Sequence, residues 1–137
     1  MGNTIHSMKT TINLPAPNKH NYNKIVFACI NALMECGCIL TGHSPVMNET
    51  KKIHVIVGEY HSMFTYSDYV KMKVEMPKAG NITIKINVYQ SVRLISFTHI
   101  FLMFKLKKKI KYLISNTNKL EQLYNTKKFI PNPNLQI

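Results

Sequence analysis

Two cysteines and a histidine near residue 40 are the residues best spaced to bind a metal. Cys36, Cys38 and His43 are two and five residues apart, and Cys29 lies seven residues before Cys36. Structural zinc sites use Cys and His pairs, commonly two to four residues apart within a pair. Here the paired C-x-x-C spacing is missing. Cys29 and Cys36 also share one face of a predicted helix, where buried cysteines behave as small hydrophobic residues. We expect no metal and no other cofactor, with Cys36, Cys38 and His43 as the alternative ligands.

The sequence offers few residues in a pattern that suits nucleophilic or acid–base catalysis. A cysteine nucleophile needs a nearby base that favours its thiolate. Cys38 could pair with His43 or His54, but nothing in the spacing requires either pairing. Cys36 would lie at the C-terminal end of the predicted helix, where the helix dipole disfavours a thiolate. The 6 acidic residues are dispersed, and the 5 glycines form no phosphate-binding loop. We therefore expect a protein that is not an enzyme.

The lysines are the remaining candidates for function, as residues that could bind an anionic partner. The chain of 137 residues has a formal net charge of +12, and Arg93 is its single arginine among 18 basic residues. Five lysines crowd one short stretch and three more lie on a predicted hairpin: Lys105, Lys107, Lys108, Lys109 and Lys111, and Lys71, Lys73 and Lys85. A balance this basic is typical of proteins that bind an acidic protein, an anionic membrane surface or nucleic acid.

The amino-acid composition of the chain helps to decide which of these partners is favoured. Ile, Lys and Asn together supply 47 of the 137 residues, a bias that an AT-rich genome produces through its codons. Part of the positive charge therefore need not reflect function. Arginine, which is favoured for bidentate contacts with phosphates and bases, is nearly absent. We rank an acidic protein or an anionic membrane surface ahead of nucleic acid.

Residues 99–115 are predicted to form an amphipathic helix, with Thr98 as its N-terminal cap. At 100° per residue, its apolar side chains fall within an arc of about 120°: Leu102, Met103, Leu106, Ile110, Leu113 and Ile114. The five lysines lie outside this arc, as do Phe104 and Tyr112. A membrane span would need ~20 apolar residues, more than this stretch offers. Three interpretations remain: a helix packed on a sheet with a solvated cationic face, a helix lying in the plane of a membrane, and a basic helix that binds a partner.

Alternating apolar and polar residues predict the sheet on which this helix would pack. Residues 70–76 and 82–88 alternate with a period of two and are joined by a short Pro- and Gly-containing turn, which predicts an antiparallel hairpin with one buried face. Further strands are predicted at 8–14, 38–41, 53–58 and 92–97, with a loop over 42–51. A helix is predicted over 22–36, capped by Asn21 and ended by Gly37.

These elements predict an α+β fold in two layers, with an antiparallel sheet of four to five strands and two helices on one face. We expect one domain over residues 1–125 with a basic C-terminal helix, followed by an extended tail over 126–137. We see no signal peptide, and three cysteines without a disulfide pattern favour an intracellular location. The expected function is a non-catalytic binding or assembly module that contacts an acidic protein or an anionic membrane surface through the eight lysines named above. The alternative is a nucleic-acid-binding protein that uses the basic sheet face and the C-terminal helix.

Overall fold

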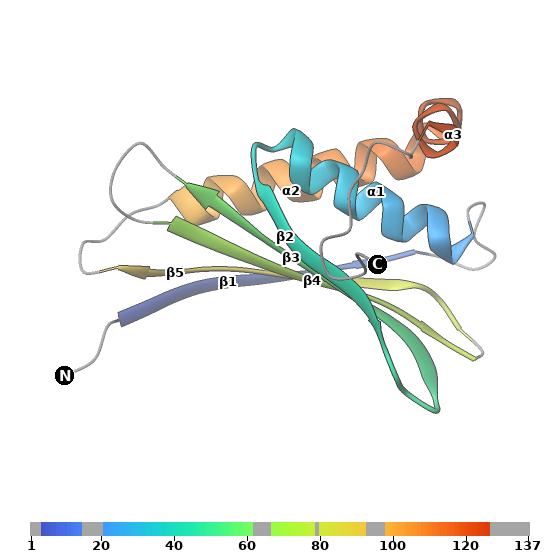
Figure 1. Ribbon diagram of the computed structural model, residues 1–137, viewed down its shortest axis with the longest axis horizontal. Helices are drawn as coiled ribbons and strands as arrows, with labels where there is room; N and C mark the ends of the chain where they lie inside the picture. Colours follow the sequence, from blue (N-terminus) through green and yellow to red (C-terminus); the bar gives the residue numbers. More distant parts are fainter. Residues whose placement is uncertain (1–3, 15–20, 62–66, 79, 93–97, 127–137) are drawn as a thin grey trace.

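The computed structural model describes residues 4–14, 21–61, 67–78, 80–92 and 98–126. Its elements follow the order β1 (Thr4–Asn13), α1 (Tyr22–Glu35), β2 (Ile39–Val46), β3 (Lys51–His61), β4 (Ser67–Pro77), β5 (Thr83–Val92), α2 (Thr98–Ser115) and α3 (Thr117–Asn125). The five strands form one antiparallel sheet in the order β1-β5-β4-β3-β2. Helices α1 and α2 lie on the same face of this sheet (Figure 1). The predicted two-layer α+β fold is therefore confirmed.

The hairpin of β4 and β5 forms the floor of the core. Its alternation places one row of aliphatic side chains on the face that the helices cover, each at most 1% exposed: Val70, Met72, Val74, Ile82, Ile84, Ile86 and Val88. The predicted buried face of the hairpin is confirmed, and the lysines of its opposite face, Lys71, Lys73 and Lys85, are exposed.

Helix α1 begins and ends where its sequence predicts. The Asn21 side chain accepts a hydrogen bond of 2.8 Å from the Lys24 backbone N–H, which satisfies one free donor of the first turn. After the helix, Gly37 adopts a φ of +89°, a conformation that glycine enters without the penalty of a Cβ atom. Between these ends, Ile25, Cys29 and Leu33 are fully buried against the sheet.

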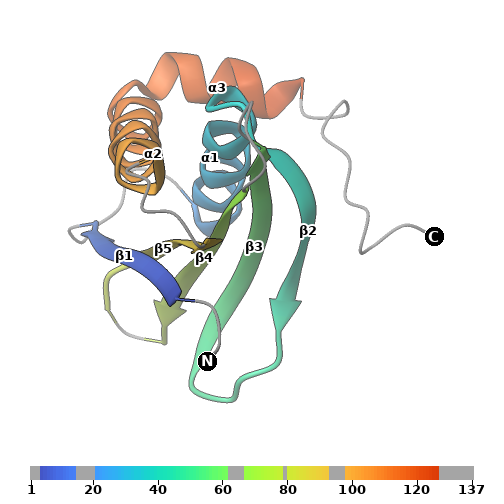
Figure 2. The same cartoon turned by 90° about the vertical axis from the view of Figure 1, so that its left-hand side faces the viewer.

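Helix α2 covers the sheet beside α1, and α3 lies across both helices. Five members of its predicted apolar arc are at most 3% exposed: Leu102, Met103, Leu106, Ile110 and Leu113. The sequence leaves room for a further turn or two after Asn116. Instead, Asn116 caps a separate helix, α3, by accepting from the Lys119 backbone N–H at 3.1 Å. Leu120 of α3 is fully buried, and Figure 2 shows α3 running over the ends of α1 and α2.

Several predicted strand limits are wrong, above all the loop over 42–51. Strand β2 continues to Val46 and pairs with β3 from Ile39↔Glu59 to Val46↔Ile53, with a bulge between Leu40 and Gly42. Gly42 and Pro45 are unfavourable within a strand, but β2 is an edge strand with one unpaired side and tolerates both residues. Strand β3 runs past Gly58 to His61, and β1 starts at Thr4 instead of residue 8.

Two predicted segments fall outside the described residues. The strand predicted over 92–97 is described only at Val92, which ends β5. The extended tail predicted over 126–137 is described only at Thr126, whose backbone N–H bonds to the Leu123 carbonyl at the end of α3.

Candidate functional site

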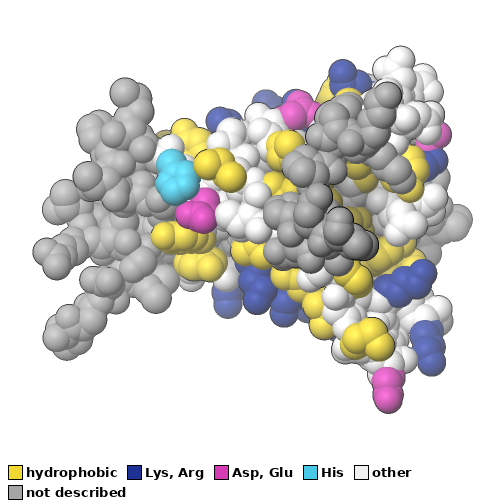
Figure 3. All heavy atoms as spheres, in the orientation of Figure 1, with side chains coloured by type: hydrophobic (Ala, Val, Ile, Leu, Met, Phe, Trp, Pro, Cys, Tyr) yellow, Lys and Arg dark blue, Asp and Glu magenta, His cyan; other side chains and the backbone are white. Residues whose placement is uncertain are grey.

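The eight lysines singled out in the sequence divide between the two layers of the fold. Lys71, Lys73 and Lys85 lie on the outer face of the sheet, opposite in parity to the buried Met72 and Ile86. The other five belong to α2, in the helical layer. Figure 3 shows lysine side chains along the helical side of the molecule and, separately, beneath the sheet. The tertiary structure therefore makes two basic surfaces out of one predicted set.

Two of the five α2 lysines are engaged within the protein. Lys107 Nζ donates to Thr10 Oγ1 of β1 at 3.0 Å. Lys109 Nζ lies 2.9 Å from Glu35 Oε1, at the C-terminal end of α1. The hydrogen bond and the charge of Glu35 raise the pKa of Lys109 above its usual value. Both side chains flank the apolar arc, so their stems cover its edges while their ammonium groups find local partners.

The remaining three α2 lysines share an exposed surface with aromatic side chains. Lys105, Lys108 and Lys111 are exposed and have no ion-pair partner among the described residues. Phe101 is 67% exposed, Phe104 58% and Tyr112 47%. Residues three, four and seven apart lie on the same side of a helix, so these six form one surface, hereafter the α2 outer face. The sequence placed Phe104 and Tyr112 among the lysines. It missed Phe101, whose spacing of three and four from Phe104 and Lys105 was the available signal.

A regular array of polar side chains occupies the outer face of β4, β5 and β1. The strand register aligns Lys71 with Asn87 and Asn87 with Lys9 in one row. In the next row it aligns Lys73 with Lys85 and Lys85 with Thr11. Hereafter these six residues are the sheet array; together with the backbone of β1 and β5 they surround a hollow of 290 Å³. Lys9 and Thr11 were not predicted, because they precede the hairpin by more than 50 residues and join it only through pairing.

Glu75 supplies the countercharge beside this array. It is 8% exposed, and its Oε1 lies 3.0 Å from Lys51 Nζ and 3.4 Å from Lys85 Nζ. Burial alone would raise the pKa of Glu75, but hydrogen bonds from the two lysines outweigh it and hold the pKa below its usual value. Glu75 therefore pairs with lysines of both neighbouring strands.

The three alternative metal ligands, Cys36, Cys38 and His43, have different surroundings in the structure. Cys36 and Cys38 are buried, and His43 instead faces His54 across β2 and β3, with Nδ1 and Nε2 2.8 Å apart. Within the described part of the chain, no three His, Cys, Asp or Glu side chains converge on a point where a metal could bind. Burial raises the pKa of Cys29 and of Cys38 to about 12, which keeps both thiols protonated at neutral pH.

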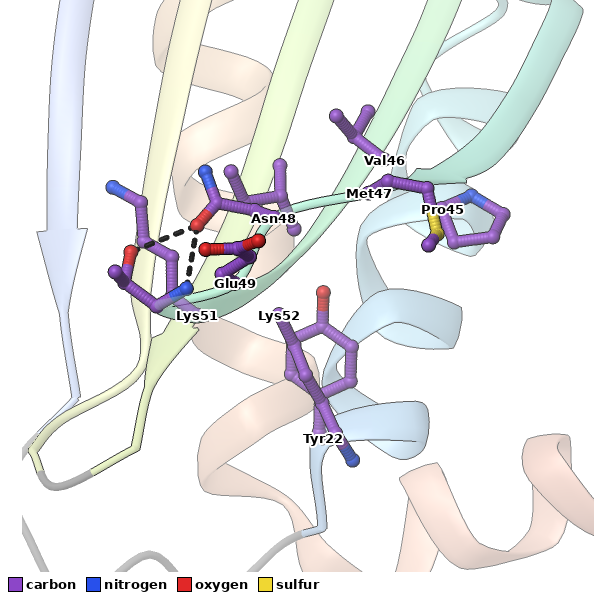
Figure 4. Close-up of a pocket in the computed structure, with 10 residues that line it drawn as sticks. Tyr22, Pro45, Val46, Met47, Asn48, Glu49, Lys51 and Lys52 are labelled. Atoms are coloured by element: carbon purple, nitrogen blue, oxygen red, sulfur yellow. Dashed lines mark hydrogen bonds between the residues drawn. The ribbon is translucent and has the colours of Figure 1, made fainter.

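A wide hollow of 1020 Å³ lies beneath the β2–β3 turn (Figure 4). It is lined by the turn itself and by Tyr22 of α1, whose hydroxyl is already bonded to the Val74 carbonyl at 2.8 Å. Asn48 Oδ1 likewise accepts from the Thr50 hydroxyl and backbone N–H within the turn. The Tyr22 hydroxyl and the Asn48 side-chain oxygen are thus already engaged in local hydrogen bonds.

A buried polar cluster joins β4 and β5 to the start of α2. The Gln90 amide nitrogen donates to Asp68 Oδ1 and, at 3.1 Å, to Thr98 Oγ1. Asp68 is 1% exposed and Gln90 is fully buried. Sequence reasoning missed this cluster because its three residues belong to separate elements. Its hydrogen bonds fix the N-terminal end of α2 to the sheet.

Comparison with known proteins leaves the geometry to carry the argument. The sequence matches no family model and no curated protein. The crystal structure of Ara h 8.0201 aligns over 82% of this chain and 100% of its own, with 15% identity and a TM-score of 0.38. At that identity and TM-score the likeness carries no inference about fold or function. Among the described residues, no helix is long and apolar enough to cross a bilayer.

Proposed function

We propose that this protein is a non-catalytic module that binds the surface of anionic lipid bilayers through the α2 outer face. The observation that carries the proposal is the exposure of Phe101, Phe104 and Tyr112 beside three lysines without ion-pair partners among the described residues. Large aromatic side chains are usually buried, so three on one exposed helix face indicate a contact surface. Aromatic rings that enter the headgroup region, flanked by lysines, are what interfacial helices share.

The kind of basic residue favours a bilayer over the other acidic partners. Lysine is depleted at protein–protein interfaces, where arginine is enriched. Bidentate recognition of bases in nucleic acids also favours arginine. A negatively charged lipid surface attracts lysine and arginine alike, by about 1 kcal/mol for each residue near the surface. A chain with 17 lysines among its 18 basic residues therefore suits a bilayer best.

The helix would bind differently from an ordinary in-plane helix. Its apolar arc is committed to the core, where Leu106 and Ile110 are fully buried. Binding would instead use the opposite side, so the folded domain would sit on the bilayer without unfolding α2. This arrangement predicts weak, salt-sensitive and reversible binding, because the contribution of the charges falls with ionic strength.

The test compares two variants that lose the same charge from different layers. One carries Lys105→Gln, Lys108→Gln and Lys111→Gln on α2, and the other carries Lys71→Gln, Lys73→Gln and Lys85→Gln on the sheet. Co-sedimentation with phosphatidylserine-containing vesicles measures binding. At about 1 kcal/mol for each lysine, the α2 variant should bind roughly 100-fold more weakly, and the sheet variant should stay close to wild type.

A third variant separates the aromatic contribution from the charge. Phe101→Ser with Phe104→Ser keeps every lysine and should weaken binding to the same vesicles at high salt, where only apolar contacts persist. Equal losses in the α2 and sheet variants would mean that net charge alone drives binding and would overturn the proposal. Absence of binding to anionic vesicles at low salt would overturn it as well.

A further inference from the structure

We propose that the sheet array is a second binding site, which takes a small oligophosphate such as tripolyphosphate or the phosphate chain of a nucleotide. This inference goes beyond the proposed membrane contact. The array belongs to the sheet, whereas the α2 outer face belongs to the helical layer, so the two surfaces face in different directions (Figures 1 and 3). Bilayer binding through α2 therefore leaves these lysines without an explanation.

The strand register places like charges next to one another in the sheet array. Lys73 and Lys85 are directly opposite each other on β4 and β5. Like charges in that position destabilise a sheet. Lys71 and Lys9 flank Asn87 in the adjacent row, so four ammonium groups lie on three neighbouring strands. With strands about 4.8 Å apart and alternate residues about 7 Å apart, the Cα atoms of the four lysines lie within about 12 Å of one another.

The lysines of the sheet array outnumber the carboxylates beside them in the described structure. Glu75 already bonds Lys51 and Lys85, and within the described residues Lys9, Lys71 and Lys73 have no carboxylate partner. An anion with three or four negative charges in the hollow of 290 Å³ would match these free ammonium groups. It would also offset the repulsion between Lys73 and Lys85, of which only Lys85 pairs with Glu75 among the described residues.

The neutral members of the sheet array, Asn87 and Thr11, also suit an anion held by the lysines. Asn87 Oδ1 is buried and has no hydrogen-bond donor among the described residues, although lysines adjoin Asn87 on both sides. An anion that orders the lysine side chains would bring N–H donors to this oxygen. The Thr11 hydroxyl completes the second row and can donate to a phosphate oxygen.

The neighbouring tyrosines favour a small anion over a nucleic-acid strand. Tyr69 and Tyr89 occupy the next row, where their rings stack on each other with centroids 5.5 Å apart and planes 25° apart. Platforms for single strands need aromatic faces on which bases can stack. Here each ring already covers a face of the other, so phosphate recognition remains the better supported chemistry.

Calorimetric titration with sodium tripolyphosphate, at constant ionic strength set by NaCl, tests the site. The wild-type protein should bind tripolyphosphate, and the midpoint temperature of its thermal unfolding should rise when tripolyphosphate is present. Lys73→Gln should weaken binding at least tenfold while leaving the midpoint without ligand unchanged or higher, because it removes repulsion. Lysines that are merely solvated would give no loss of binding in this variant. Lys108→Gln on α2 is the matched control and should bind tripolyphosphate as wild type does.

Each contrary outcome overturns the inference. One is that Lys73→Gln and Lys108→Gln bind tripolyphosphate equally well. Another is that NaCl at the same ionic strength raises the unfolding midpoint as much as tripolyphosphate does. A third is a random single-stranded oligonucleotide that binds the array far more tightly than tripolyphosphate, which would assign the site to nucleic acid. The α2 triple variant used with vesicles should keep full tripolyphosphate binding, so failure of one proposal is distinguishable from failure of the other.

Discussion

His43 Nδ1 and His54 Nε2 lie 2.8 Å apart across β2 and β3, so one imidazole donates the single proton between them and the other accepts it. The rings are 5.1 Å apart, centroid to centroid. Burial lowers the pKa of His43, and burial together with the charge of His43 lowers the pKa of His54 from 6.5 to about 4. The pair is therefore neutral in the folded protein at neutral pH.

This pair predicts a loss of stability in mild acid. The unfolded chain takes up protons on these histidines near pH 6.5, whereas folded His54 does so only near pH 4. The unfolded state thus binds more protons between these values, and the free energy of unfolding falls as the pH decreases from 6.5 to 4. Because solvent reaches both rings, we expect a loss of roughly 1–2 kcal/mol. Urea unfolding at pH 7 and pH 4.5 should show a smaller difference for His54→Gln than for wild type.

Glu75→Gln should destabilise the outer face of the sheet. The substitution removes the only carboxylate that bonds Lys51 and Lys85 among the described residues, and it leaves Lys85 opposite Lys73 without a countercharge. We expect a loss of about 1–2 kcal/mol in the free energy of unfolding at pH 7. The loss should shrink as the pH falls through the lowered pKa of Glu75, where wild type also becomes neutral. Lys78→Gln, which changes an exposed residue without an ion pair in the described structure, should have little effect.

Gly58→Ala should disturb the contact between β3 and α1. A Cβ atom at residue 58 would lie 2.6 Å from Leu33 Cδ2 and 3.1 Å from the Ile39 carbonyl oxygen. Leu33 is fully buried, so its side chain cannot move away freely, and overpacking of this kind costs about 1–3 kcal/mol. Equilibrium unfolding of Gly58→Ala, Leu33→Ala and the double variant should show that the two losses are less than additive. Strict additivity would mean that the side chain does not oppose the new methyl group.

The three cysteines should alkylate slowly and in a defined order. Thiolates are the reactive species, and burial raises the pKa of all three thiols. The ammonium groups of Lys105 and Lys109 oppose this rise at Cys36, whereas fully buried Cys29 has no such help. Iodoacetamide labelling of native protein, followed by peptide mass spectrometry, should modify Cys36 first and Cys29 last. Rapid labelling of Cys38 would revive the cysteine–histidine pairing that the sequence left open.

Much of the fold could be predicted because it depends on local periodicity. Alternation over 70–88 indicated which face of the hairpin is buried, and the arc containing Leu106 indicated which side of α2 packs on the sheet. Strand β2 could not be predicted in the same way. Gly42 and Pro45 weaken its pattern, and its extended conformation depends on backbone pairing with β3.

The candidate sites were only partly visible in the sequence. The lysine-rich stretch indicated that α2 carries a basic surface. It could not reveal that Lys109 pairs with Glu35 or that Lys107 bonds to Thr10. Nor could it show that Phe101 remains exposed. These relations join residues from different elements, so no spacing within one element encodes them.

The sequence by itself determined the two layers, the buried side of each main element and the excess of lysine. Only the tertiary structure decided that these lysines form two surfaces, and that Lys9 from β1 completes the array with Lys71, Lys73 and Lys85. The physical reason is that periodicity within a segment settles which side chains leave water. The register between distant strands and the packing of one helix against another settle which side chains meet.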